Sequence, residues 1–187
     1  MSHRKFLTLT EVNDLISAVK NKQTGIRDRC IILLAFRHGL RISELLALRF
    51  SDLNMSDGRI NIHRLKNGFS TIHPLMKDEH NSIMEWKHAR ENWKPAEDPD
   101  IIFISQRGSR LSRTQAWRII REAGERAGTS THTHPHMLRH ACGYELAERG
   151  TDTRLIQDYL GHRNIRHTVR YTASNAARFF GLWEDAK

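Results

Sequence analysis

Cysteine and long apolar runs are scarce in this chain of 187 residues, and acidic residues are fewer than basic ones. Cys30 and Cys142 each lie within an apolar helical pattern, which predicts buried thiols of a cytosolic protein and excludes a disulfide framework. The longest apolar run, IILLAF at 31–36, is far shorter than the roughly 20 residues that span a bilayer. The opening MSHRKFLTLTEV lacks the apolar stretch of a signal peptide. The sequence therefore predicts a cytoplasmic protein without a membrane partner.

Basic side chains outnumber acidic ones. There are 30 Lys and Arg against 21 Asp and Glu, which gives a formal net charge of +9. Such an excess favours a polyanionic partner, nucleic acid ahead of an anionic membrane surface. Many of the cations are arginines, whose planar fork grips a phosphate through two hydrogen bonds. Charge alone leaves open a protein that is merely basic and soluble.

Apolar residues recur at helical spacing along most of the chain. Thr8 and Glu11 have the spacing of a capping box, which predicts a helix from there to about Val19. Gly39 is expected to end a second helix that begins near residue 25, and Ser43 can cap a short third helix. Further helices are expected at about 78–91, 113–127, 137–149, 153–160, 164–171 and 175–184.

Two stretches have the character of strands. Residues 59–75 alternate apolar and polar side chains around Asn67–Gly68, which is a strong β-hairpin pattern. IIFIS at 101–105 predicts a short buried strand or extended segment. The sequence contains neither an internal repeat nor a clear domain boundary. The expected fold is therefore mainly α with a small antiparallel β-sheet, an α+β class, in a single domain over residues 1–187.

Several stretches could act on a phosphodiester without a metal. Such a site needs cations on the non-bridging oxygens, a nucleophile, and an acid for the leaving oxygen. Arg41 precedes a helix N-terminus, where an anion can be held, and Glu44 could orient its guanidinium. Lys66 stands at the expected hairpin tip, and an ammonium loses a proton more readily than a guanidinium. Taken singly, each is better explained as an ordinary surface charge.

The stretch HTHPHMLRH at 132–140 crowds four histidines beside one arginine. His136 and Arg139 are one helical turn apart, so they share a face near the helix start that Pro135 favours. The spacing of His136 and His140 is also compatible with zinc. Cysteines and carboxylates are absent from this stretch at ligand spacing. We therefore interpret it as part of an anion site and predict no bound metal.

A last candidate segment is YLGHRNIRHTVRYT at 159–172. His162 follows a helix break, and Tyr171 comes nine residues later. A tyrosine, with a pKa of about 10, attacks poorly unless cations stabilise the phenolate or a base takes its proton. Arginines near this segment and near Arg41 are candidate DNA contacts: Arg37, Arg163, Arg166 and Arg170.

In this order, the motifs resemble the tyrosine recombinase (phage integrase-type) family. The family pattern is an Arg in a G-L-R-x-S-E-L turn, a Lys in a β-hairpin, H-x-L-R, a His or Trp after L-G, and a C-terminal Tyr. The chain matches it with GLRISEL at 39–45, Lys66, HMLR at 136–139, LGH at 160–162 and Tyr171. IHRLKNGFSTIHPL, HPHMLRHACG and RLIQDYLGHRNIRHTVRYTASNAARF resemble the short fimbrial-switch DNA invertases nearly along their whole length.

The resemblance implies a mechanism and a set of partners. Tyr171 would attack the scissile phosphate and form a 3′-phosphotyrosyl link, while Arg41 and Arg139 hold the non-bridging oxygens. Lys66 would be the acid for the leaving 5′-hydroxyl. The substrate would be double-stranded DNA with inverted-repeat sites, synapsed by a homo-tetramer with DNA-bending host proteins as helpers. No cofactor is implied.

The resemblance implies two further catalytic residues, His136 and His162, and two supporting ones, Glu44 and His140. His136 would act as base toward Tyr171, and His162 would hydrogen-bond the phosphate in the transition state. Glu44 would support the first arginine, and His140 would support the site. Members of the family typically carry an additional N-terminal DNA-clamping domain, which this chain is expected to lack, as the short invertases do. A non-catalytic DNA-binding regulator on the same scaffold and a zinc hydrolase are the rival hypotheses.

Overall fold

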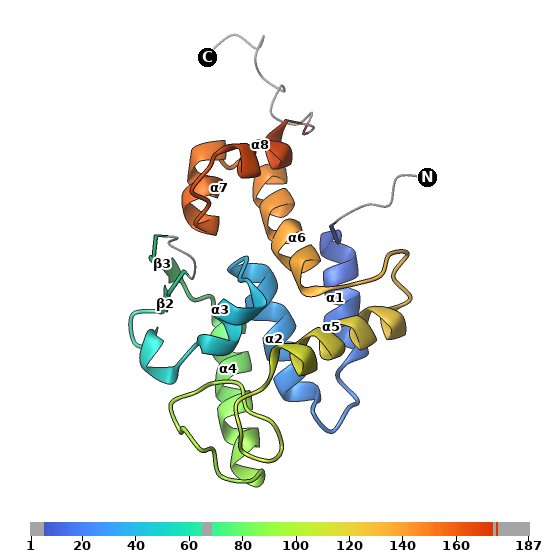
Figure 1. Ribbon diagram of the computed structural model, residues 1–187, viewed down its shortest axis with the longest axis vertical. Helices are drawn as coiled ribbons and strands as arrows, with labels where there is room; N and C mark the ends of the chain where they lie inside the picture. The colour runs from blue at the N-terminus through green and yellow to red at the C-terminus, as the bar shows by residue number, and fades with distance from the viewer. Residues whose placement is uncertain (1–5, 65–68, 174, 176–187) are drawn as a thin grey trace.

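The computed structural model describes residues 6–64, 69–173 and 175, and its architecture is mainly helical (Figure 1). The mainly α prediction is confirmed. The expected Asn67–Gly68 turn and all of the expected 175–184 helix except Asn175 lie outside the described residues. The helices are α1 Leu9–Ala18, α2 Gly25–Arg37, α3 Ile42–Ala47, α4 Lys77–Ala89, α5 Arg113–Ala127, α6 Pro135–Glu148, α7 Thr153–Leu160 and α8 Arg166–Thr172, with 3₁₀ turns at Phe50–Asp52 and Arg90–Asn92.

Helix α2 is the centre of the molecule. Its residues 30–32 and 34–36 are buried, and α1 and α5 lie to one side of it while the sheet lies to the other (Figure 1). The capping box of α1 is confirmed, since the Glu11 N–H donates to Thr8 Oγ1 at 3.2 Å and the Thr8 N–H donates to Glu11 Oε2 at 2.8 Å. This capping box fixes where α1 begins. The buried Val12 and Leu15 of α1 then pack in the core.

Gly39 ends α2, as the sequence predicts, and it also sets how α2 meets α7. Its φ is +56°, a left-handed conformation that favours glycine. A Cβ at this position would lie 2.3 Å from Leu160 Cδ2 and 3.3 Å from Cys142 Sγ. The C-terminal ends of α2 and α7 therefore approach each other closely only because a side chain is missing here.

The sheet is antiparallel and has the strand order β1-β2-β3. Strands β2 Arg59–Ile62 and β3 Thr71–Pro74 pair with Ile60 opposite His73, so the predicted pairing is confirmed. Strand β1 Leu53–Asn54 was not predicted, because two residues are too short to show an alternating pattern. Ile60 and Ile62 face the core from β2.

Two local predictions need correction or refinement. Ser43 does not cap α3: the helix begins at Ile42, Arg41 is its N-cap residue, and the Glu44 carboxylate accepts the Arg41 N–H at 3.0 Å. The segment 101–105 is buried and forms only isolated bridges, to residues 49 and 110, so it lies outside the three-stranded sheet.

The thiols and the membrane prediction can also be compared with the fold. Cys30 and Cys142 are buried free thiols, as expected, and burial raises the pKa of each to about 12. Within the described ranges, no helix is long and apolar enough to cross a membrane.

Candidate active site

Four segments far apart in the sequence converge at the facing ends of α2 and α7. Arg41 follows α2, Arg139 lies on α6, His162 follows α7, and Tyr171 lies on α8. Arg139 Nη2 donates to the carbonyl of Leu160, two residues before His162, at 2.7 Å, and the rings of His162 and Tyr171 stack at 6.2 Å. Burial and then the charges of Arg139, Arg170 and Arg41 lower the pKa of His162 to about 3. The structure thus brings these predicted site residues into one positively charged region.

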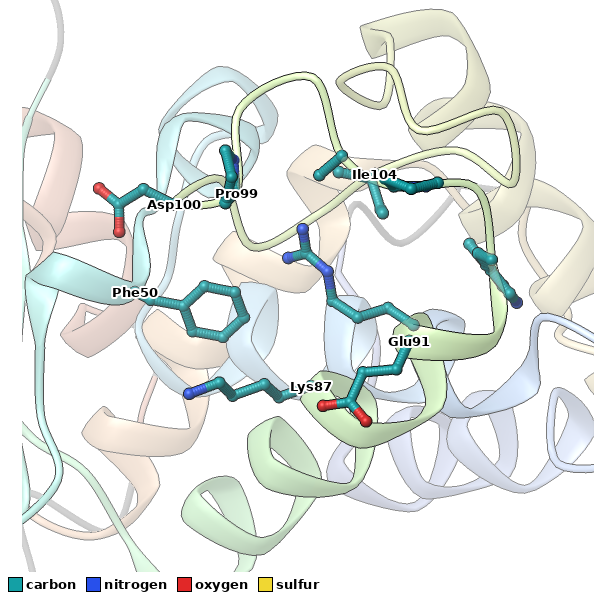
Figure 2. Close-up of a pocket in the computed structure, with 10 residues that line it drawn as sticks. Phe50, Lys87, Glu91, Pro99, Asp100 and Ile104 are labelled. Atoms are coloured by element: carbon teal, nitrogen blue, oxygen red, sulfur yellow. The ribbon is translucent and has the colours of Figure 1, made fainter.

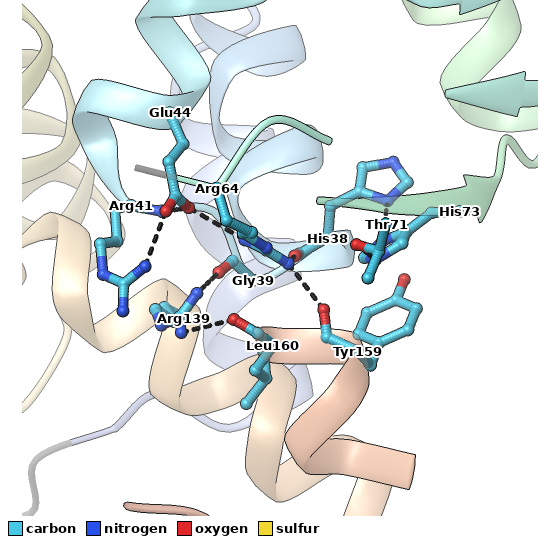
Figure 3. A network of polar contacts seen from close by, with 10 residues as sticks. All are labelled: His38, Gly39, Arg41, Glu44, Arg64, Thr71, His73, Arg139, Tyr159 and Leu160. Carbon is cyan, nitrogen blue, oxygen red and sulfur yellow. Dashed lines mark hydrogen bonds and ion pairs between the residues drawn. The ribbon is translucent and has the colours of Figure 1, made fainter. Parts of the chain in front are cut away.

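A carboxylate orients the first arginine of this region. Arg41 Nη1 donates to Glu44 Oε1 at 2.7 Å (Figure 3). Burial would raise the pKa of Glu44, but the Arg41 N–H and the charges of Arg64 and Arg41 outweigh it and hold the pKa below its usual value. Glu44 is 2% exposed, so it is an anion fixed inside the protein, and only part of the Arg41 guanidinium is engaged by it.

The second arginine is held by main-chain carbonyls. Arg139 Nη1 donates to the carbonyl of Gly39, and Nη2 donates to the carbonyl of Leu160 at 2.7 Å (Figure 3). Burial and the nearby charges of Arg64 and Arg41 lower the pKa of Arg139 to about 10. Arg139 therefore remains a cation at neutral pH, and its planar fork is fixed between two helix ends.

The hydroxyl of Tyr171 is hydrogen-bonded to His140, with His140 Nδ1 3.0 Å from Tyr171 Oη. Burial, then the charges of Arg170 and His136, lower the pKa of His140 to about 4, so the ring is neutral near pH 7. His136 lies one turn earlier on α6 and is exposed, and its pKa is also lowered, first by desolvation and then by His134 and Arg139. His140 is thus the imidazole in contact with the expected nucleophile.

The Tyr171 ring is enclosed and is 1% exposed. The Tyr144 ring meets it edge-on at 5.1 Å, the His162 ring stacks at 6.2 Å, and the Arg170 guanidinium lies 5.3 Å from its centroid. Burial raises the pKa of Tyr171, while Arg170 and Arg139 act in the opposite direction. Gly143 makes room for the ring, because a Cβ there would lie 2.6 Å from Tyr171 Cε2.

His162 is oriented by a buried hydroxyl. Its Nδ1 lies 2.9 Å from Thr168 Oγ1, and Thr168 is 0% exposed. Gly161, at φ +65°, turns the chain sharply after α7 and leads directly into His162. With Nδ1 accepting the Thr168 hydroxyl proton, the Nε2–H of a neutral His162 is left as a donor.

The remaining predicted site residues are the candidate DNA contacts and Lys66. Arg37 pairs with Asp78 at 2.8 Å, while Arg163 and Arg166 are exposed. Arg170 is exposed beside Tyr171, and its Nε donates to the His167 carbonyl at 2.9 Å. Lys66 lies outside the described residues.

Sequence reasoning missed one residue of this region, Arg64. Its side chain is 0% exposed, and it donates to Glu44 Oε2 at 2.9 Å (Figure 3). It follows β2 two residues after Ile62, so the alternation along the strand places it on the same core-facing side as the buried Ile60 and Ile62. This position was visible in the sequence and indicates a buried polar contact, because a cation on the core-facing side of a strand needs buried partners.

One further pocket lies apart from this region. A pocket of about 690 Å³ at the C-terminal end of α4 is lined by Phe50, Lys87 and Arg90, among others, with both cations about 5 Å from the Phe50 ring (Figure 2). It shares none of the site residues named above. Among the residues that the structure describes, there is no group of three His, Cys, Asp or Glu that could hold a metal ion.

Comparisons with known proteins give the family. The model of the phage integrase family matches residues 5–178. Type 1 fimbriae regulatory protein FimE of Escherichia coli K12 is 70% identical over 98% of this chain and 93% of its own length, and FimB of the same strain is 50% identical over 98% and 92%. The crystal structure of XerA recombinase superposes with a TM-score of 0.80 at 27% identity, over 93% of this chain and 62% of that one.

Proposed function

The chain belongs to the phage integrase family, and we propose that it is the site-specific recombinase of a fimbrial switch, which inverts a DNA segment through a 3′-phosphotyrosyl intermediate. It is a tyrosine recombinase, an enzyme that cleaves and rejoins DNA. The observation that carries the proposal is the environment of Tyr171. Its hydroxyl is hydrogen-bonded to His140, and the charge of Arg139 acts on it. The 70% identity with FimE along nearly the whole chain supports the fimbrial role.

In the proposed reaction, Tyr171 Oη attacks the scissile phosphorus and the 5′-oxygen leaves. One phosphodiester is exchanged for another, so the free energy of the broken bond is kept and rejoining needs no ATP. Arg41 and Arg139 hold the non-bridging oxygens, where negative charge increases in the transition state. Their existing contacts support this role, because an arginine has five N–H donors and both guanidinia are already fixed in place.

Proton transfer is assigned to the histidines and to Lys66. We propose that His140 receives the hydroxyl proton of Tyr171, while His136 binds the phosphate and serves as the alternative base. Both rings have lowered pKa values in the DNA-free protein, and the negative phosphate will raise them when DNA binds. His162 donates from Nε2 to the phosphate, and Lys66 protonates the leaving 5′-oxygen.

The proposal extends to the assembly and its location. The substrate is double-stranded DNA with inverted-repeat sites, and four copies of the chain synapse two such sites in the cytoplasm, on the nucleoid, with DNA-bending host proteins as helpers. Residues 1–187 form a single catalytic domain. The exposed Arg163 and Arg166, together with Arg37 and Arg170, contact DNA phosphates.

A nicked suicide substrate tests the proposal. The protein is incubated with it in parallel with and without EDTA, and covalent protein–DNA adducts are separated under denaturing conditions. We expect an adduct from the unmodified chain and none from Tyr171→Phe, with non-covalent binding to the same DNA retained. An unmodified chain that binds its site but forms no adduct would identify a non-catalytic regulator. Loss of the adduct in EDTA would identify a metal-dependent enzyme instead.

A further inference from the structure

A buried arginine that is absent from the proposed chemistry joins the two helix ends beside the site. Arg64 Nη2 donates to the carbonyl of Tyr159 at 2.6 Å and to the carbonyl of His38 at 3.2 Å (Figure 3). These carbonyls belong to the C-terminal ends of α7 and α2. We propose that Arg64 is a positioning residue of the recombinase site, which holds these ends together so that Arg41 and His162 meet at one phosphate.

The contacts of Arg64 repeat those of Arg139 one residue earlier in each helix end. Arg139 donates to the carbonyls of Gly39 and Leu160, the residues that follow the acceptors of Arg64. Carbonyls at a helix C-terminus lack intrahelical donors and carry partial negative charge, so a cation stabilises them. Two guanidinia therefore connect the same pair of helix ends in parallel. Arg139, which is 4% exposed, binds the phosphate in the proposed function, whereas the side chain of Arg64 is 0% exposed and has no role in that chemistry.

A third contact connects Arg64 to the phosphate-binding arginine itself. Glu44 accepts from Arg64 Nη1 through Oε2 at 2.9 Å and from Arg41 Nη1 through Oε1 at 2.7 Å. The carboxylate is therefore shared between a buried cation and an accessible one. Without Arg64, Glu44 would be a buried anion with a single cationic partner, and the orientation of Arg41 would depend on a less firmly held carboxylate.

Close packing leaves this arrangement little freedom to relax. A Cβ on Gly161 would lie 2.9 Å from Arg64 Cγ and 3.1 Å from its Nε. The stem of Arg64 therefore rests against the turn that leads into His162. With a side-chain exposure of 0%, Arg64 cannot touch DNA, so any effect on cleavage must pass through its neighbours.

The test compares Arg64→Met and Arg64→Lys with Arg27→Met in single-turnover cleavage of the suicide substrate across pH. Arg27 is a matched control, since it is 6% exposed, pairs with Asp28 at 2.7 Å and donates to the Ile104 carbonyl at 3.2 Å. DNA affinity and thermal unfolding are measured in parallel, which separates a loss of positioning from a loss of fold or of binding.

We expect R64M to cleave about 100-fold more slowly, as misplaced catalytic groups do, with unchanged DNA affinity. The acid limb of its pH profile should move to higher pH, because the Glu44 carboxylate loses a cation that lowers its pKa. R64K keeps the charge but not the planar fork, so its rate should fall between those of R64M and the unmodified chain. R27M should lose stability and cleave normally per folded molecule.

The inference rests on the proposed function, and different results would overturn each of them. An unmodified chain without a Tyr171-dependent adduct removes the proposed function. A normal adduct together with a folded R64M of unchanged rate and pH profile overturns only the role of Arg64. If R64M does not fold, R64K decides, because cleavage at the unmodified rate would show that the fork is not needed.

Discussion

Replacing Gly143 with alanine should displace Tyr171, the proposed nucleophile, from its buried position. The new Cβ would lie 2.6–2.8 Å from three atoms of the Tyr171 ring, whereas carbon atoms normally approach to about 3.5–4.0 Å. The ring must therefore retreat by about 1 Å, and its 3.0 Å contact with His140 must lengthen or break. We expect cleavage of the suicide substrate to slow by about 100-fold, as it does for comparable misplacements.

The stability change should be small by comparison. Overpacking costs about 1–3 kcal/mol, and the gain in helix propensity from Gly to Ala returns about 1 kcal/mol. A net loss of about 1 kcal/mol lowers Tm by roughly 2–4 °C in a chain of this size. Differential scanning fluorimetry measures it, and binding of the Gly143→Ala variant to DNA should be unchanged because Gly143 is buried.

Gly124→Ala provides the matched control. It is also a buried helical glycine, and its new Cβ would lie 2.2 Å from Thr133 Oγ1, away from Tyr171. We expect a comparable loss of stability and normal cleavage per folded molecule. Equal cleavage rates for the two variants would refute the reasoning. Faster cleavage by G143A would also refute it, because the enclosed position of Tyr171 would then be an inhibitory one that the ring must leave.

Three further outcomes are expected. His140→Asn retains an acceptor near the position of Nδ1 and should cleave faster than His140→Phe, which should lose about 100-fold or more in single-turnover rate. Burial, then His38 and Arg64, lower the pKa of His73 to about 3. The unfolded chain therefore binds a proton at this site between about pH 6.5 and 3 that the folded chain does not, and His73 alone should lower stability by about 2 kcal/mol between pH 7 and pH 5. His140 and His162 add losses of the same sign, so in urea denaturation His73→Phe should reduce the total loss by about 2 kcal/mol and not abolish it. Replacing Arg163 with Gln should weaken DNA binding in fluorescence anisotropy and reduce its salt slope by about one, whereas an unchanged slope would exclude a phosphate contact.

Local sequence patterns predicted much of the fold, because helix periodicity and helix-start residues depend on interactions between residues close together in the chain. Helix α5 occupies the predicted 113–127, and Pro135 begins α6 as its fixed φ favours. The expected Ser43 cap was wrong because Glu44 already accepts the N–H of Arg41, two residues earlier than a serine cap would require. Strand β1 was missed because its two residues are fixed by pairing with β2 and not by their own sequence.

The contacts within the site were harder to predict than its members. The motif order named Arg41, Arg139, His162 and Tyr171, which the fold gathers together. The bond between His140 and Tyr171 joins residues 31 positions apart on different helices. Helical periodicity gives the face on which each residue lies, but the face that meets another helix depends on how α6 and α8 cross. Sequence spacing alone could not choose His140 over His136 as the partner of the hydroxyl.

Arg64 shows what strand alternation can predict and what it cannot. Strand β2 places Ile60 and Ile62 on its core-facing side, and the alternation continues to Arg64. A cation at that position is costly unless it is paired, so the pattern alone predicts a buried partner. It cannot name the acceptors, because the carbonyls that Arg64 binds lie 26 and 95 positions away in the chain. An arginine that interrupts an apolar alternation therefore predicts that a buried polar centre exists, and only the fold shows which segments it connects.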